Sequence, residues 1–244
     1  MKIRGFLFTG LLLPLIAGAA FAQSATTNTA IIPAPRDAAW IKRHEGFVDQ
    51  AKAGGIDLLF LGDSITDFWR SRGSNVWNTC YGSRHAANFG ISGDRTQHVL
   101  WRMDHGEVDG IKPKVVVLMI GTNNTGKERD GKTTRNTAPE AVEGVTAVVH
   151  ELRAKLPGSK ILLLAIFPRG DKTNPMRDEL RQINLQLALL ADGKTVKFLD
   201  IGPHFLEADG NISKEVMPDL LHPSAKGYEI WAKSMEPTLD QMLK

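Results

Sequence analysis

The chain alternates short apolar runs with longer stretches of helical periodicity. The apolar runs are "DLLFLG" (57–62), "AANFGI" (86–91), "VVVLMIG" (115–121), "KILLLAIF" (160–167) and "VKFLDI" (196–201). Near-continuous apolar strands separated by helix-length segments are typical of a parallel sheet with helices on both faces, because each crossover lays a helix against the sheet. The pattern therefore predicts an α/β fold.

Two helices are predicted from local signals. Thr137 and Glu140 stand at the spacing of a capping box, and apolar residues follow at helical intervals as far as Leu156. The stretch 225–243 predicts a second helix, with its apolar side formed by Ile230, Trp231, Met235 and Leu239. No internal repeat and no second set of elements is visible, so residues 37–244 are predicted to form one domain.

The first residues have the pattern of a segment that is removed after export. Residues 1–22 combine a basic start at Lys2 and Arg4, an apolar run and an A-x-A pattern that ends at Ala22. This is typical of a secretory signal peptide, and the alternative, a retained membrane anchor, is shorter than a full membrane span. Residues 23–36 are rich in Ala, Thr, Asn and Pro and predict a flexible arm. We therefore expect a secreted or periplasmic protein without stable membrane association after cleavage.

Charge and cysteine content narrow the choice of partners. Removal of Lys2 and Arg4 with the signal peptide lowers the formal net charge from +3 to +1, and no basic stripe is present. The sequence therefore gives no support for a nucleic-acid partner. Cys80 is the single cysteine, so an internal disulfide is excluded. "WNTCYG" holds no base beside the thiol, and we interpret Cys80 as a buried residue without a catalytic role.

Candidate chemistry follows the ends of the first three runs, where ligands gather in parallel α/β sheets. Ser64 in "GDSITDFW" stands between a strand and a helical stretch, which suits either a nucleophile or a helix N-cap. Gly90 and Gly93 in "NFGISGDRT" allow backbone conformations that other residues avoid, and Gly93 is a candidate N–H donor or a plain turn residue. Asn123 in "GTNN" is either an amide donor to a developing oxyanion or a turn residue.

The segment "DLLHPS" (219–224) supplies a candidate base. Asp219 precedes His222 by three positions, so the carboxylate could hold the imidazole in one tautomer. Each fragment alone has a purely structural alternative. Together they offer a nucleophile, oxyanion donors and an oriented base, each beyond a different element.

Four blocks carry a family resemblance: "LFLGDSITDFW", "NFGISGDRTQHVLWRM", "VVVLMIGTNN" and "DLLHPSAKGY". They resemble the signature blocks of the SGNH, or GDSL, hydrolases in order and spacing, and in particular those of the catalytic subunits of intracellular platelet-activating-factor acetylhydrolase. The resemblance runs from about residue 40 onward. It implies a three-layer α/β/α flavodoxin-like sandwich with a five-stranded parallel sheet, in agreement with the five apolar runs.

The resemblance also implies a role for each motif residue. Ser64 would be the nucleophile, His222 the base and Asp219 its orienting partner. The oxyanion hole would consist of the backbone N–H groups of Ser64 and Gly93 and the side chain of Asn123. In the acetylhydrolases the residues next to these positions shape a shallow acyl pocket, which here would be lined by Ile65, Thr122 and Leu221.

These implications predict an exported serine esterase that hydrolyses acetyl or other short-chain acyl esters, on a carbohydrate or glycan. The alternatives are a lipid-directed acetylhydrolase or lysophospholipase-like esterase, and a non-catalytic glycan-binding module. No cofactor and no metal are expected, because the remaining histidines lack ligand spacing. A homodimer is an open expectation by analogy with the acetylhydrolase subunits.

Segment 125–136 is longer and more charged than the resemblance suggests, and its role is open at this stage. Within it, "GKERDGKT" (126–133) matches the G-x-x-x-x-G-K-[ST] pattern of a phosphate-binding loop. Such a loop must lead directly into a helix, whereas here helix signals begin only at Thr137. We therefore do not expect phosphate binding.

Overall fold

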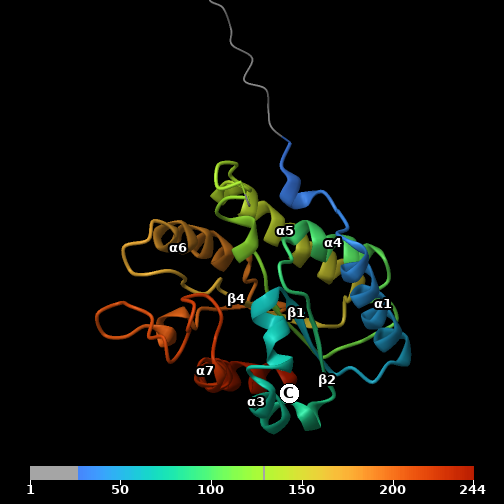
Figure 1. The fold of residues 1–244 in the computed structure, drawn as a ribbon. Coiled ribbons are helices and arrows are strands. Elements are labelled where there is room, and N and C mark those ends of the chain that lie inside the picture. Colours follow the sequence, from blue (N-terminus) through green and yellow to red (C-terminus); the bar gives the residue numbers. More distant parts are fainter. Residues whose placement is uncertain (1–26, 129) are drawn as a thin grey trace, which may run out of the picture.

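The computed structural model describes residues 27–128 and 130–244. The predicted signal peptide, residues 1–22, lies outside the described residues. Five parallel strands form one sheet in the order β2-β1-β3-β4-β5, and β2, β1 and β4 of this sheet are labelled in Figure 1. The strands are β1 (Leu58–Gly62), β2 (Ala86–Gly90), β3 (Val115–Met119), β4 (Lys160–Leu164) and β5 (Val196–Leu199). Each lies inside one of the five predicted runs, so the predicted α/β fold with a five-stranded parallel sheet is confirmed.

Helices cover both faces of the sheet. One face packs against α1 (Ala38–Ala53), α4 (Thr96–Asp104), α5 (Ala138–Lys155) and α6 (Met176–Leu187). The opposite face packs against α3 (Ser74–Cys80) and α7 (Ala225–Leu243), and α2 (Ser64–Asp67) follows β1 directly. Both helices that the sequence predicted are present, α5 with the capping box of Thr137 and Glu140 and α7 with its predicted bounds.

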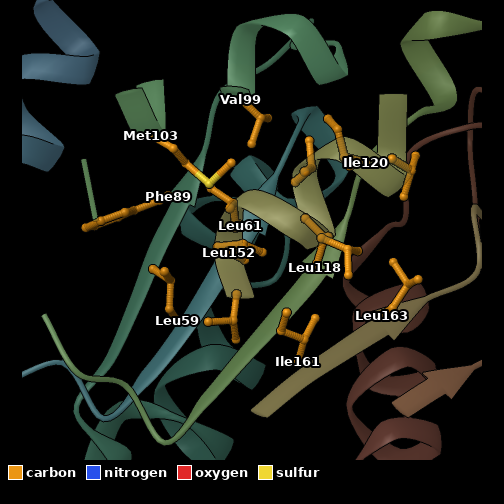
Figure 2. Packing of buried hydrophobic residues seen from close by; sticks show 14 of the residues in the cluster. Leu59, Leu61, Phe89, Val99, Met103, Leu118, Ile120, Leu152, Ile161 and Leu163 are labelled. Atoms are coloured by element: carbon orange, nitrogen blue, oxygen red, sulfur yellow. The ribbon is translucent and has the colours of Figure 1, made fainter. Parts of the chain in front are cut away.

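The two hydrophobic cores follow from strand geometry. Successive side chains of a strand point to opposite faces of a sheet. In β1, Leu59 and Leu61 accordingly join the core under α1, α4, α5 and α6, which Figure 2 shows, whereas Leu58 and Phe60 join the aromatic core under α3 and α7. All four are fully buried. Burial on both faces explains why β1 to β4 appear in the sequence as nearly continuous apolar runs, whereas β5 carries the exposed Lys197.

The segment before α1 differs from the expected flexible arm over its described part. Residues 27–36 run along α4 and α5, and the Thr96 hydroxyl donates to the Ala30 carbonyl at 2.7 Å. The Ala34 N–H donates to the Gln97 carbonyl at 3.1 Å. Ala30 itself is fully buried. This segment, called the N-terminal strap below, therefore makes specific contacts with the body of the domain.

Candidate active site

Ser64 stands at the first position of α2, directly beyond β1. The preceding Asp63 caps this helix, because its carboxylate accepts the Ile65 N–H at 2.9 Å. The capping role that Ser64 could have had therefore falls to Asp63. This leaves the Ser64 hydroxyl available for another partner, and Ser64 retains 7% of its surface in contact with solvent.

The partner of Ser64 is His222, which comes from the loop before α7. The Ser64 Oγ lies 2.9 Å from His222 Nε2, and His222 Nδ1 lies 2.8 Å from Asp219 Oδ2. A carboxylate can only accept here, so it selects the tautomer in which Nδ1 carries the proton and Nε2 accepts the serine proton. The structure thus joins the three predicted residues in one chain of hydrogen bonds.

The backbone conformation of residues 219–222 places the Asp219 carboxylate beside the His222 ring. Leu220 adopts a left-handed conformation with φ of 57°, which is uncommon for a residue with a side chain. The resulting turn lets Asp219 Oδ1 accept the N–H groups of Leu221 at 3.2 Å and His222 at 2.7 Å, while Oδ2 binds the ring. Partial burial works to raise the pKa of Asp219, but these hydrogen bonds outweigh it and hold the pKa below its ordinary value.

An aromatic ring and a cation flank this pair. The Phe68 ring lies 5.1 Å from the His222 ring, and the Arg72 guanidinium lies over Phe68 at 4.9 Å. Arg72 Nη1 is also 3.9 Å from Asp219 Oδ2. The side chain of Asp219 is 46% exposed, so Arg72 and Phe68 supply part of the cover that the protein gives to the Asp219–His222 pair.

The second predicted donor, Gly93, lies in the turn after β2. Gly93 has φ of 83°, and the Asp94 N–H donates to the Ile91 carbonyl at 3.1 Å across the turn. The Asp94 carbonyl accepts the Asn123 Nδ2 at 3.0 Å. This bond brings the turns after β2 and β3 together and fixes which end of the Asn123 amide is the donor.

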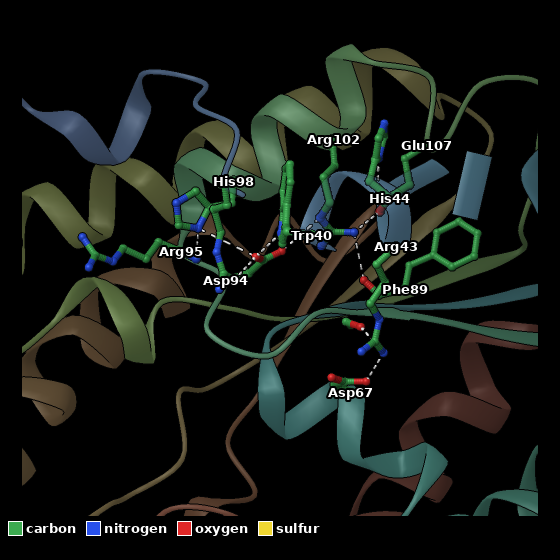
Figure 3. Close-up of polar contacts among 12 residues, drawn as sticks. Trp40, Arg43, His44, Asp67, Phe89, Asp94, Arg95, His98, Arg102 and Glu107 are labelled. Atoms are coloured by element: carbon green, nitrogen blue, oxygen red, sulfur yellow. Dashed lines mark hydrogen bonds and ion pairs between the residues drawn. The ribbon is translucent and has the colours of Figure 1, made fainter. Parts of the chain in front are cut away.

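The Asp94 carboxylate anchors the turn in the protein interior. Figure 3 shows this network around Trp40, Asp94 and Arg102. Asp94 Oδ1 accepts the Trp40 indole N–H at 2.7 Å, and Asp94 Oδ2 pairs with Arg102 Nε at 3.0 Å. Arg36 Nη1 also donates to Asp94 Oδ1, at 3.0 Å. A buried carboxylate with three such partners holds the 91–94 turn firmly.

Asn123 belongs to the 3₁₀ turn Thr122–Asn124, which two arginines hold from outside the sheet. Arg169 Nη1 donates to the Thr122 carbonyl and Arg135 Nη1 to the Asn123 carbonyl, both at 3.0 Å. Arg135 comes from the charged 125–136 segment. The structure thus gives this segment a role that the sequence left open, namely support for the turn that carries Asn123.

The same segment does not form a phosphate-binding loop. Lys127 and Thr134 pair as an isolated antiparallel bridge, and within the described residues of this segment no helix begins, the next one being α5 at Ala138. Glu128 forms a two-bond ion pair with Arg95, with both N···O distances at 2.7 Å. This pair ties the segment to the start of α4.

Of the residues expected to line an acyl pocket, Ile65 and Leu221 are the chain neighbours of Ser64 and His222, and Thr122 directly precedes Asn123. Ile65 and Thr122 are 1% exposed, and Leu221 is half-buried. Ile65 belongs to the hydrophobic core under α3 and α7, and Leu221 packs against that core. Thr122 Oγ1 accepts a hydrogen bond from Arg169 at 3.2 Å. Ile65 and Thr122 are therefore part of the packed interior, directly next in the chain to Ser64 and Asn123.

The prediction that Gly90 adopts a backbone conformation closed to other residues is wrong. Gly90 is not among the glycines with positive φ. A Cβ atom at Gly90 would lie 2.4 Å from the Asp67 nitrogen and 2.9 Å from the Asp63 carbonyl oxygen. Gly90 is therefore required because α2 packs directly on the end of β2.

Other chemically active groups lie apart from this arrangement. Cys80 is half-buried between α3 and α7, and burial raises the pKa of its thiol, which makes it a poor nucleophile. Among the described residues, no group of three or more His, Cys, Asp or Glu side chains is arranged to hold a metal ion. Surface cavities of about 320 Å³ beside α6 and about 500 Å³ between α3 and α7 have none of the predicted site residues in their walls.

Residues missed by the sequence reasoning support this site from a distance. Asp94 stands next to Gly93, and its charge in a strand-end turn was a usable signal. Arg36, Arg135 and Arg169 gave no such signal, because they come from three separate segments and meet the site only after folding.

The model of the GDSL-like Lipase/Acylhydrolase family matches residues 60–230, from β1 into α7. The chain belongs to the GDSL-like lipase/acylhydrolase family. It is therefore a hydrolase of acyl esters, and the resemblance recognised in the sequence is confirmed. None of the described helices of this GDSL hydrolase combines the length and apolar character needed to cross a membrane.

Curated relatives cover almost the whole GDSL chain. It is 36% identical over 227 residues to the human platelet-activating factor acetylhydrolase IB subunit alpha1, covering 91% of this chain and 94% of the human protein. It is 37% identical over 209 residues to the alpha2 subunit from Rattus norvegicus, covering 85% of this chain and 86% of the rat protein.

Solved structures share the fold. An acetylxylan esterase from Geobacillus stearothermophilus superimposes with a TM-score of 0.60 at 23% identity, covering 78% of this chain and 94% of the esterase. A GDSL-like lipase from Bacteroides thetaiotaomicron gives a TM-score of 0.63 at 16% identity, with coverages of 81% and 97%. At these identities the similarity shows that the chain and the two solved structures share the same α/β fold.

Proposed function

We propose that the protein is an exported serine esterase that removes acetyl or other short acyl groups through Ser64, His222 and Asp219. The observation that carries the proposal is the hydrogen-bond chain from Ser64 Oγ through His222 to Asp219, with distances of 2.9 and 2.8 Å. A serine, a base and an orienting carboxylate in this order are the groups that acyl transfer to a hydroxyl requires.

The chemistry proceeds in two halves. Ser64 Oγ attacks the ester carbonyl while His222 Nε2 takes its proton, and Asp219 stabilises the imidazolium that forms. The oxyanion receives hydrogen bonds from the Ser64 and Gly93 N–H groups and Asn123 Nδ2. The alcohol leaves with the proton from His222. Water then attacks the acyl-enzyme by the same route and releases the acid and free Ser64.

A short acyl group on a carbohydrate is the substrate that we favour. Ile65, directly after Ser64, and Thr122, directly before Asn123, are both buried, and we expect side chains held in this way to exclude long acyl chains. The acetylxylan esterase with the same fold acts on an acetylated glycan, as its name states, and the N-terminal pattern favours export to a place where glycans are met. A lipid alcohol is the second candidate, because the curated relatives are acetylhydrolases of platelet-activating factor.

Ser64→Ala tests the proposed nucleophile. The change should lower kcat for a chromogenic acetate ester by about 10⁴ to 10⁶, as for other serine hydrolases, without lowering the melting temperature. Activity within tenfold of the wild type would contradict the role of Ser64. A folded wild-type protein without any turnover would favour a glycan-binding module.

A substrate panel tests acyl length and alcohol. Acetyl esters should be hydrolysed far better than octanoyl esters, and equal kcat/KM for the two would argue for an open, lipase-like site. Acetate release from acetylated xylan, acetylated sialic acid, acetylated peptidoglycan and an acetylated phospholipid decides between carbohydrate and lipid. The N-terminal sequence of the protein recovered from outside the cytoplasm should begin at Gln23, and retention of Met1 would contradict cleavage after Ala22.

A further inference from the structure

The turn that carries Gly93 is of a kind for which a glycine permits two forms. Residues 91–94 form a β-turn closed by the hydrogen bond from the Asp94 N–H to the Ile91 carbonyl. Gly93, in the third position, has φ of 83°, and Ser92 is not among the residues with positive φ, which together define a type II turn. A type I turn differs mainly by a rotation of the central peptide, here Ser92–Gly93, and glycine permits either form.

The orientation of this one peptide decides whether the second oxyanion donor exists. The Ser92 C=O and the Gly93 N–H belong to the same trans peptide and therefore point in opposite directions. In the observed form the Gly93 N–H has no hydrogen-bond acceptor among the described residues. A rotated peptide would withdraw this N–H and would turn the Ser92 carbonyl to the side that the N–H now faces.

The guanidinium of Arg36 holds the carbonyl side of the same peptide. Arg36 Nη1 donates to the Ser92 carbonyl at 2.8 Å. A Cβ atom built on Gly93 would lie 3.3 Å from both Arg36 Nη1 and Nη2, so the guanidinium lies against the turn itself. A charge-assisted hydrogen bond of this kind is about twice as strong as a neutral one, and it would be lost if the peptide rotated.

We propose that Arg36 is a positioning residue that locks the Ser92–Gly93 peptide with its N–H directed to the oxyanion. The inference rests on the proposed function, because it presumes that Gly93 serves the Ser64 reaction. Arg36 does not touch the substrate in this scheme. It acts through the peptide, whose N–H it also makes a stronger donor by polarising the attached carbonyl.

The surroundings of Arg36 fit a fixed cation. Its side chain is 29% exposed and pairs with the buried Asp94 at 3.0 Å. The next residue, Asp37, caps α1 by accepting the Trp40 N–H at 3.0 Å. On the other side, the N-terminal strap is bonded to α4 through Ala34 and Gln97. Arg36 is therefore held on both sides along the chain.

The test compares Arg36→Met with Trp40→Phe. Arg36→Met keeps the apolar stem but removes the guanidinium, whereas Trp40→Phe removes the other N–H donor to Asp94 Oδ1 and leaves the Ser92 carbonyl bonded. We expect Arg36→Met to lower kcat for an acetate ester by about 10- to 100-fold with KM within twofold, since at most one oxyanion donor is lost. Trp40→Phe should lower the melting temperature while kcat stays within threefold of the wild type.

Arg36→Lys keeps the positive charge beside Asp94, which protects folding, and should recover part of the lost kcat because an ammonium also donates to the Ser92 carbonyl. A kcat for folded Arg36→Met within threefold of the wild type would overturn the inference. An equal loss of kcat in Trp40→Phe would also overturn it, because the effect would then belong to Asp94. Ser64→Ala, assayed in parallel, distinguishes failure of the proposed function from failure of the role of Arg36. If Ser64→Ala stays active, the proposed function is wrong. If Ser64→Ala is inactive and Arg36→Met has normal activity, only the role of Arg36 is wrong.

Discussion

At the scale of single residues, the two oxygens of Asp219 do different work. Oδ1 accepts two backbone N–H groups of its own loop, and Oδ2 accepts the His222 ring N–H. One carboxylate therefore shapes the loop and selects the tautomer of His222. The Asp219→Asn substitution separates the two tasks. Its side-chain amide has one acceptor oxygen and one donor NH₂ group, whereas the carboxylate has two acceptor oxygens.

Asp219→Asn should lower kcat more than Asp219→Ala does. The asparagine oxygen would keep the bonds to the Leu221 and His222 N–H groups, which leaves its NH₂ facing His222 Nδ1. That arrangement selects the tautomer with the proton on Nε2, which cannot accept the proton of Ser64. We expect a loss of about 10³ to 10⁴ in kcat for Asp219→Asn and a smaller loss for Asp219→Ala, whose histidine is free to choose its tautomer.

Melting temperatures measured beside kcat should rank the two variants in the opposite order, since only Asp219→Asn retains the loop bonds. If Asp219→Ala proved the less active of two folded variants, loop order would outweigh the tautomer as the main contribution of Asp219.

At the scale of elements, the position of Ser64 depends on how closely α2 approaches the sheet. Two hydrogen bonds tie the end of α2 to the turn after β2, from the Ser92 N–H and hydroxyl to Asp67 Oδ2 at 3.2 and 2.7 Å. The Asn88 side chain donates to the Thr66 carbonyl at 2.8 Å. These contacts are possible because Gly90 leaves no side chain between β2 and the helix.

Gly90→Ala should therefore affect both stability and activity. The new methyl group would overlap the backbone of α2, at a cost of about 1–3 kcal/mol in the free energy of unfolding. Displacement of Ser64 by even about 1 Å would lower kcat by about 10²-fold.

The matched control is Gly46→Ala in α1, where a methyl group meets no atom within 4 Å. This variant should be as stable as the wild type or more so, by about 0.5–1 kcal/mol, with unchanged kcat. Normal kcat in folded Gly90→Ala would show that α2 can shift without cost to the reaction.

The turn that begins β5 provides a pH-dependent contribution to stability. Asp192 Oδ1 accepts the N–H groups of Lys194, Thr195 and Val196 at 2.7–2.9 Å. These bonds, that of Val196 foremost, lower the pKa of Asp192 from 3.8 to about 2. Since the folded state lowers this pKa, the stabilisation is fully present above the pKa of the unfolded chain and is lost as the pH falls from about 4 to about 2.

Asp192→Ala should accordingly have a lower melting temperature than the wild type at pH 7. The difference in melting temperature between the two proteins should be smaller at pH 3. The control is Asp49→Ala, because the Asp49 side chain is 79% exposed and its one ion pair with a described residue is that with Lys52, at 3.8 Å. If this difference in melting temperature is the same at pH 7 and pH 3, the variant loses stability through altered packing and not through loss of the carboxylate hydrogen bonds.

At the scale of the whole molecule, the sequence predicted the parts of the fold that depend on local pattern. Strands β1 to β4 stood out because they are buried on both faces, and α5 stood out through the capping box of Thr137 and Glu140. The catalytic candidates were recognisable because strand ends and the motifs beyond them coincide. The short α2 and the contacts of the strap left no comparable periodicity.

What the sequence could not predict depends on contacts between distant segments. Arg36 and Asp94 are 58 positions apart, and Arg169 and Thr122 are 47 apart. An arginine in a polar stretch has the same local pattern whether it faces solvent or holds a carbonyl beside the site. The different need for glycine at Gly90 and Gly93 was hidden for the same reason, since close approach of α2 is a property of the folded chain.

The separation of Ser64 and His222 in the sequence determines when the two residues can meet during synthesis of the chain. They are 158 positions apart, and α7 is tied to the nucleophile turn by the bond from the Tyr228 hydroxyl to the Ile65 carbonyl at 2.6 Å. Protein domains grow from the N-terminus at about 5–20 residues per second. The ribosome therefore completes all five strands before His222 can reach Ser64. On the proposed mechanism, we expect the growing chain to lack esterase activity until the segment with His222 has been made.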